Sequence, residues 1–250
     1  MVRLLPLLAL AAAALSAPLQ ARETVTVVVV EEWVASGSAR FVPADLAVER
    51  RAIASYGPFR VLDGQRAALV DVTDSASPAQ FAAMLRDYPA LATLEMVECP
   101  GTEDDRANLD LGRMIRAAGI ATHVPAGGSV RSGAVELFLA GADRRIDDGA
   151  EFAVHSWIDE DGREARDFAP GAAIHAPYIA YYREMGMDEA AARAFYAMTN
   201  SVGFADARWL RAEEMRRWLA PQTAGPDTAA PAPQPAAPRI AYLDLGAALP

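Results

Sequence analysis

The sequence predicts an α/β fold, in which strands and helices alternate along the chain. Short apolar or β-branched runs of strand length recur between segments whose apolar residues have helical spacing. The composition, 52% hydrophobic and 22% charged, is that of a globular chain with enough apolar material for a core. A length of 250 residues fits one domain with appendages.

Strands are predicted at five places, where β-branched or apolar runs end in turn residues. The dipeptide Asp63-Gly64 is a turn signal that divides the second place into two strands. Ligands in α/β sheets bind at the carboxyl ends of strands, so the residues that follow these runs matter most. The predicted strand regions are residues 24–36, 59–74, 91–98, 120–126 and 151–157.

Helices are predicted where apolar residues repeat at i, i+3 and i+4. Ser77 is the expected N-cap of the first helix, with Pro78 at its first helical position. Gly119 is expected to end the second helix, and Gly186 to separate two later ones. The predicted helical regions are residues 77–90, 108–118, a segment that begins at Ser132, 176–200 in two parts, and 208–219.

The two ends of the chain differ in composition from the middle. Residues 1–21 read as a secretory signal peptide, with Arg3, an apolar run and then small residues. A retained membrane anchor is the alternative, but the run is shorter than the roughly 20 residues that span a bilayer. A Pro- and Ala-rich tract that cannot form a core follows Pro221. We therefore predict one domain over residues 22–219, a mobile tail over residues 220–250, and an exported protein, periplasmic or secreted.

Charge and residue usage exclude several function classes. A formal net charge of −10 argues against nucleic acid and against an anionic membrane surface as partners. All 23 basic residues are arginine, which excludes Ser-Lys dyads, Schiff bases and P-loops. His123 and His175 have no partner at ligand spacing, so we expect no metal and no cofactor. The single Cys99 cannot form an intramolecular disulfide.

Two glycine-containing stretches compete for a catalytic role. In "CPGTEDD", Gly101 lies between a strand and a helix, where backbone N–H groups could hold a negative charge. In "AGGSVRSG", Ser132 stands at the start of a helix, and a plain capping role is the alternative there. His155, on a later strand, could remove the proton of a serine hydroxyl, although it could equally be a packed core residue.

Residues 59–219 resemble the Clp protease proteolytic subunit family of the crotonase-like superfamily, and more closely its divergent exported relatives. The stretches "CPGTEDD", "LDLGRMIRAAGIATHV", "RSGAVELFLAGADRRI" and "AVHSW" carry the resemblance, in that order and at similar spacing. It implies a fold of repeated ββα units with helices packed on the sheet. It also implies peptide or protein substrates and, as is usual in the superfamily, assembly into a homo-oligomer.

The resemblance implies a serine hydrolase of the peptidase type. Ser132 takes the nucleophile position and His155 the base, and the oxyanion loop falls on Gly101 and Thr102, with Gly133 after the serine. This assignment makes Gly127 and Gly128 a turn between a strand and a helix.

Three features depart from the family pattern. Thr102 replaces a glycine of the oxyanion loop, and its Cβ could obstruct a positive φ. The cysteines that often flank the serine in exported relatives are absent. The third triad member would be Asp206, which lies one residue from the expected position at Ala207 and could instead be an N-cap.

Other interpretations stay open at this point. A catalytically inactive binding or scaffold protein of the periplasm would explain Thr102 and the displaced Asp206. Acyl-CoA chemistry would need a coenzyme that an exported protein does not normally meet, and a Cys99 nucleophile is a further alternative. Several aromatic residues could line a substrate groove or form helix core: Tyr178, Tyr181, Tyr182, Phe195 and Tyr196.

Overall fold

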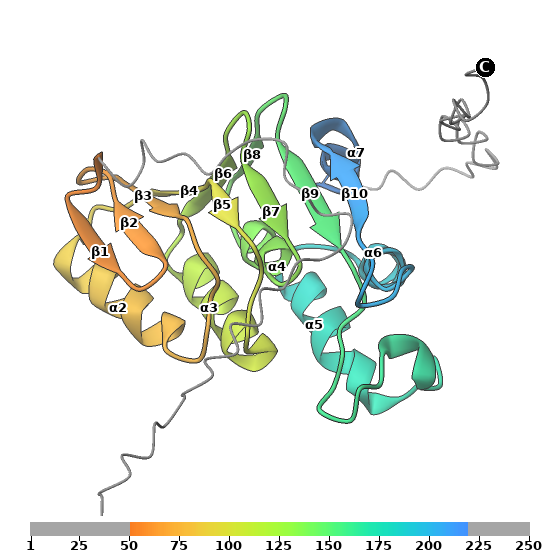
Figure 1. Ribbon diagram of the computed structural model, residues 1–250. Helices are drawn as coiled ribbons and strands as arrows, with labels where there is room; N and C mark the ends of the chain where they lie inside the picture. The colour runs from red at the N-terminus through yellow and green to blue at the C-terminus, as the bar shows by residue number, and fades with distance from the viewer. Residues whose placement is uncertain (1–50, 220–250) are drawn as a thin grey trace, which may run out of the picture. The chain divides into compact units, whose positions relative to one another are not determined.

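A computed structural model describes residues 51–219 of the chain (Figure 1). The predicted signal peptide, the strand predicted over residues 24–36 and the predicted tail lie outside the described residues. Within residues 51–219 no helix has the length and apolar character needed to cross a membrane.

The larger sheet has six strands in the order β1-β2-β3-β4-β6-β8. β1, β2 and β3 pair antiparallel, and Asp63-Gly64 lies in the turn between β2 and β3, as predicted. From β3 onward the neighbours are parallel, which requires the crossover connections that the helices supply. The strands are β1 (Ala54–Tyr56), β2 (Phe59–Val61), β3 (Arg66–Leu69), β4 (Thr93–Met96), β6 (Ala121–Val124) and β8 (Arg144–Ile146).

The smaller sheet has four strands in the order β10-β9-β7-β5. β5, β7 and β9 are parallel, and β10 closes the sheet antiparallel to β9. The carboxyl ends of the three parallel strands therefore meet the start of β10 at one edge. The strands are β5 (Glu98–Cys99), β7 (Ser129–Arg131), β9 (Glu151–Val154) and β10 (Arg208–Arg211).

The chain builds both sheets with one repeated unit. In β4-β5-α3, β6-β7-α4 and β8-β9-α5, the first strand joins the six-stranded sheet and the second joins the four-stranded sheet. α3 and α4 each return the chain to the start of the next unit, whereas α5 leads into α6. The α/β class and the repeated ββα arrangement predicted from the sequence are thus confirmed.

The helices pack on one face of the strands and bury the largest side chains. α2 lies beside α3, and α3 lies beside α4 (Figure 1). The aromatic residues that could line a substrate groove or form helix core belong to the core. Four of them are buried there, and Tyr178 is partly buried against it; the four are Tyr181, Tyr182, Phe195 and Tyr196. The helices are α2 (Ser77–Asp87), α3 (Asp105–Ala117), α4 (Ala134–Leu139), α5 (Ala176–Glu184), α6 (Glu189–Thr199) and α7 (Ala212–Leu219), with short 3-10 turns at Ala165–Asp167 and Ala173–His175.

The structure corrects several predicted boundaries. Residues 208–219 are not one helix, because β10 forms first and α7 follows it. Residues 91–98 fall into two strands of different sheets, and the second helix begins three residues early because Asp104 caps it. Ala76, not Ser77, is the N-cap of α2. Gly127 and Gly128 do form a turn, but it leads into β7 and not directly into a helix.

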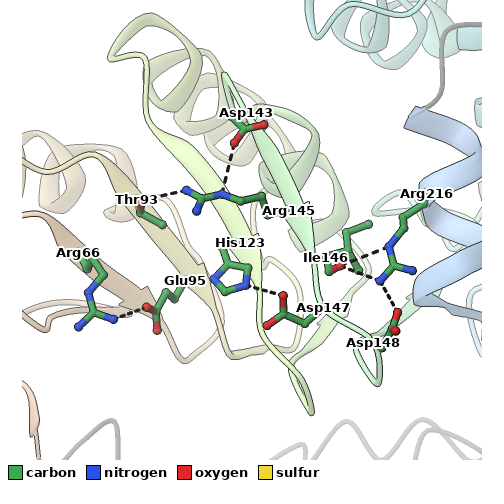
Figure 2. Close-up of polar contacts among 10 residues, drawn as sticks. All are labelled: Arg66, Thr93, Glu95, His123, Asp143, Arg145, Ile146, Asp147, Asp148 and Arg216. Carbon is green, nitrogen blue, oxygen red and sulfur yellow. Dashed lines mark hydrogen bonds and ion pairs between the residues drawn. The ribbon is translucent and has the colours of Figure 1, made fainter.

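The other face of the six-stranded sheet carries polar residues across β4, β6 and β8 and a small apolar cluster around Ala68 on β3. Glu95, His123 and Arg145 are direct cross-strand neighbours on β4, β6 and β8 (Figure 2). His123 Nε2 lies 3.1 Å from Asp147 Oδ1, and Glu95 pairs with Arg66 at 3.0 Å. This alternation of apolar and polar residues along short strands places the core on the helix side.

Candidate active site

Three residues singled out by the sequence follow three adjacent parallel strands. Gly101 comes after β5, Ser132 after β7 and His155 after β9. The backbone links them, because Ser132 N–H donates to Ala153 O at 2.8 Å, two residues before His155. A Cβ placed on Gly101 would lie 2.9 Å from Ser132 Cβ and 3.3 Å from Ser132 Oγ. The sheet register thus brings all three to one edge.

Ser132 has a backbone conformation that is unusual for its residue type. Its φ of +49° is the only positive φ of a non-glycine residue within residues 51–219. The residue was expected to cap the following helix, but the N-cap of α4 is Gly133, and no side chain caps it. Within the described residues the Ser132 hydroxyl makes no hydrogen bond. A structural capping role therefore does not account for this serine.

Unused backbone donors lie next to Ser132. Within residues 51–219 the N–H groups of Gly101, Thr102 and Gly133 donate no hydrogen bond, although Gly101 is buried. Buried N–H groups without a partner are rare in folded proteins. Gly133 N–H belongs to the same peptide as Ser132 O, which accepts from Val135 N–H at 2.9 Å. Since C=O and N–H of a trans peptide point in opposite directions, Gly133 N–H points away from α4.

Thr102 does not meet the backbone obstruction that its Cβ suggested. The positive φ of the loop, +140°, falls on Gly101, and Thr102 keeps a negative φ. Its hydroxyl lies 3.2 Å from both Thr73 O and Asp104 O, and its methyl group packs against Gly133. A Cβ on Gly133 would lie 2.5 Å from Thr102 Cγ2, so the glycine is required where the loop meets the helix.

His155 is oriented by the backbone. Its Nδ1 lies 2.8 Å from Ser156 O, and because a carbonyl oxygen only accepts, Nδ1 carries the proton in this contact. In the neutral ring Nε2 is then the nitrogen that can accept a proton. The ring of Phe204 packs edge-on against the imidazole, with centroids 5.0 Å apart. Within residues 51–219 no hydrogen bond joins His155 to Ser132 or to a carboxylate.

Asp206 lies near this site but in a turn. Asp206 N–H donates to Gly203 O at 3.0 Å, and the residue is exposed. β10 pairs Arg208 with Val154, so extending this register by one residue places Ala207 opposite His155. Directly opposed residues of an antiparallel pair share one face of the sheet. The resemblance assigns Asp206 the role of the triad acid, and this assignment stays a prediction. The extended register places Ala207, not Asp206, opposite the histidine.

Sequence reasoning missed three buried polar residues around this site. Thr73 and Asn108 are 0% and 2% exposed and contact the loop and the helix start. Glu136, on α4, accepts a hydrogen bond from Tyr182 at 2.6 Å, and burial raises its pKa from 4.5 to about 7. A signal was present for Glu136, a single charge inside the apolar run AVELFLA. Thr73 and Asn108 have no such signal.

The remaining candidates lie elsewhere or pack structurally. Cys99 is buried at the end of β5, with its Sγ 3.5 Å from Leu69 O. His175 is buried and contacts Tyr196 Oη at 2.7 Å, and His123 lies on the polar sheet face. No group of three or more potential metal ligands occurs in the described part of the chain.

Solved protease structures resemble part of this chain. A mutant of the 1510-N membrane-bound stomatin-specific protease, in complex with a substrate peptide, is 19% identical over 59% of this chain and 70% of its own, with a TM-score of 0.41. The 1510-N membrane protease specific for a stomatin homolog from Pyrococcus horikoshii is 14% identical over 60% and 68%, with a TM-score of 0.39. A ClpP1 mutant from Listeria monocytogenes is 13% identical over 62% and 88%, with a TM-score of 0.42.

No family profile and no curated protein sequence matches the chain. Likenesses as distant as these three establish no activity for it.

Proposed function

We propose that this protein is a serine hydrolase, peptidase-like, with Ser132 as the nucleophile and His155 as the base. One observation carries the proposal. Ser132 holds a positive φ of +49°, and within residues 51–219 its hydroxyl and the adjacent N–H groups of Gly101 and Gly133 make no hydrogen bond. Backbone strain of this kind costs roughly 1–3 kcal/mol and is concentrated at functional sites.

The geometry supports acyl transfer in two steps. His155 Nε2 takes the proton of Ser132 Oγ as the oxygen attacks a peptide or ester carbonyl carbon. The carbonyl oxygen becomes negative and is held by N–H groups of the Gly101–Thr102 loop and of Gly133, each donor being worth about 3–4 kcal/mol in comparable sites. The imidazolium then protonates the leaving group, and water repeats the sequence on the acyl-enzyme to release the acid.

In this proposal the group that orients the catalytic histidine is a backbone carbonyl and not a carboxylate. Ser156 O fixes the His155 tautomer with the proton on Nδ1, which is the positioning task of the acid in a triad. A neutral carbonyl stabilises the imidazolium less than a carboxylate does. We therefore expect a working but slow enzyme.

We further propose peptide or protein substrates, export from the cytoplasm and a homo-oligomeric state. Export rests on residues 1–21 of the sequence, with their single basic residue followed by an apolar run. The substrate class and the oligomer rest on the resemblance stated from the sequence. The acidic net charge of −10 supports a proposal without nucleic acid as a partner.

The nucleophile is tested with a fluorophosphonate probe on the full chain. Wild type is expected to label, and Ser132→Ala is expected to abolish labelling. Ser55→Ala, on the exposed first strand, is the matched control and should label like wild type. Labelling of Ser132→Ala at the wild-type level would refute the assignment.

A second candidate function is a catalytically inactive binding or scaffold protein of the periplasm. Ala207 at the position opposite His155, and the lack of a Ser132–His155 hydrogen bond within the described residues, favour it. The two candidates differ in turnover. Hydrolysis of any ester or peptide that is lost in both Ser132→Ala and His155→Ala excludes the inactive protein.

A further inference from the structure

A chain of hydrogen bonds connects the loop at Gly101 with the start of α4. Its two side chains, Thr73 and Asn108, are 0% and 2% exposed, and buried polar groups persist only where they are hydrogen-bonded. Thr73 precedes α2, and Asn108 lies in the first turn of α3. Neither residue is among those that the sequence assigned to the site.

Thr73 holds the loop peptide. Its N–H donates to Gly101 O at 3.1 Å, and its carbonyl oxygen accepts from Glu103 N–H at 2.8 Å. Gly101 C=O shares a trans peptide with Thr102 N–H, so fixing the carbonyl on Thr73 directs that N–H to the opposite side. The Thr102 N–H, which donates to no group among residues 51–219, therefore has a fixed direction.

Asn108 holds the helix start. Thr73 Oγ1 lies 3.0 Å from Asn108 Oδ1 and 3.3 Å from Gly101 O, and since a hydroxyl has one proton we assign it to the shorter contact. This donation fixes which end of the Asn108 amide is oxygen. Nδ2 then donates to Gly133 O at 2.6 Å. With Ser132 O held by Val135 N–H, both peptides that flank Gly133 have fixed orientations.

We propose that Thr73 and Asn108 are positioning residues: Thr73 sets the direction of the Thr102 donor on the loop, and Asn108, which holds the peptide after Gly133, fixes the helix start that carries the Gly133 donor. The inference rests on the proposed function. A site gains most from donors that need no reorganisation when charge develops, so their alignment acts on the chemical step and little on ground-state binding. Neither side chain contacts the reacting atoms in this proposal.

The test compares isosteric variants of two buried threonines on hydrolysis of p-nitrophenyl butyrate. Thr73→Val removes the hydroxyl that orients Asn108, while Thr73→Ser keeps it. Thr122→Val is the matched control, because Thr122 is 0% exposed and its Oγ1 donates to Phe138 O at 2.7 Å, on the later part of α4. We expect Thr73→Val to lower the Ser132-dependent kcat by 10- to 100-fold with KM changed less than threefold. Thr73→Ser and Thr122→Val should stay within threefold of the wild-type kcat.

Hydrogen exchange gives a readout that does not depend on turnover. Amides of residues 99–104 and 131–135 are expected to exchange faster in Thr73→Val and in Asn108→Asp, and at the wild-type rate in Thr122→Val. Asn108→Asp also serves if Thr73→Val does not fold, because it keeps the shape and removes the donor to Gly133 O.

The outcomes separate the two proposals. If wild type shows no Ser132-dependent turnover, the proposed function fails, and the positioning role falls with it. If wild type turns over and Thr73→Val loses no more kcat than Thr122→Val, the positioning role alone is refuted. Loss of kcat without faster exchange in the two segments refutes it as well.

Discussion

The β9–β10 register bears on which residue lies beside His155. β10 and β9 pair antiparallel up to Arg208 and Val154, and extending this register by one residue places Ala207 opposite His155. Beyond this pair the chain turns away at Gly203–Asp206, so that Ser156 N–H bonds to Val202 O. The turn carries Asp206 into solvent.

Ala207→Asp is expected to increase the rate of ester hydrolysis. A carboxylate facing His155 would stabilise the imidazolium that forms in the transition state, and we expect a rise of at least tenfold in kcat. Ala207→Asn, of the same size without the charge, should give less than a threefold change. The measurement is kcat on p-nitrophenyl butyrate with Ser132→Ala as the blank. An equal effect of both substitutions would contradict a role for the charge.

At the scale of elements, the loop after β5 and the start of α4 fit together through a single methyl group. Thr102 Cγ2 would lie 2.5 Å from a Cβ on Gly133, and Thr102 Cβ would lie 3.2 Å from it. Gly133 has no Cβ and so leaves room for the Thr102 methyl group. Loop and helix therefore act as one packed unit.

Gly133→Ala is expected to destabilise the protein by about 1–3 kcal/mol, because the new methyl group overlaps Thr102. Thr102→Ser removes Cγ2 and keeps the hydroxyl, which lies 3.2 Å from Thr73 O. The double variant should recover part of the loss, measured as the free energy of unfolding in urea. Strictly additive effects in this double-mutant cycle would show that the two residues do not interact.

At the scale of the whole molecule, the buried carboxyl group of Glu136 makes the free energy of unfolding depend on pH. Burial raises the pKa of Glu136 to about 7, although Tyr182 partly opposes this by donating to the carboxylate. Below pH 4.5 the group is neutral in the folded and unfolded chains. Between pH 4.5 and about 7 only the unfolded chain ionises, so folding becomes less favourable as the pH rises.

This group is expected to cost roughly 3 kcal/mol of stability between pH 4.5 and pH 8. Glu136→Gln keeps an acceptor for Tyr182 and removes the ionisation, so it should flatten the pH profile of the unfolding free energy. Glu213→Gln, at a side chain 77% exposed, is the control and should change the slope little. Identical pH profiles for wild type and Glu136→Gln would contradict a raised pKa.

The sequence by itself predicted the α/β class, most of the helices and part of the strands. Apolar periodicity and turn dipeptides are local, so the hairpin at Asp63-Gly64 and the helix ends at Gly119 and Gly186 could be predicted from short windows. Gly101, Ser132 and His155 were candidates from the sequence, but their common edge depends on β7, a strand that the sequence did not predict.

Only the tertiary structure decided the partners of these residues. Residues 208–211 form β10 because β9 offers an open edge, although their apolar spacing also suits a helix. Thr73 and Asn108 acquire their roles from chain segments distant in sequence, and no local pattern marks them. The placement of Ala207 opposite His155 follows from extending the pairing of Arg208 with Val154, a sheet register that hydrogen bonds between strands set and that sequence spacing alone does not fix.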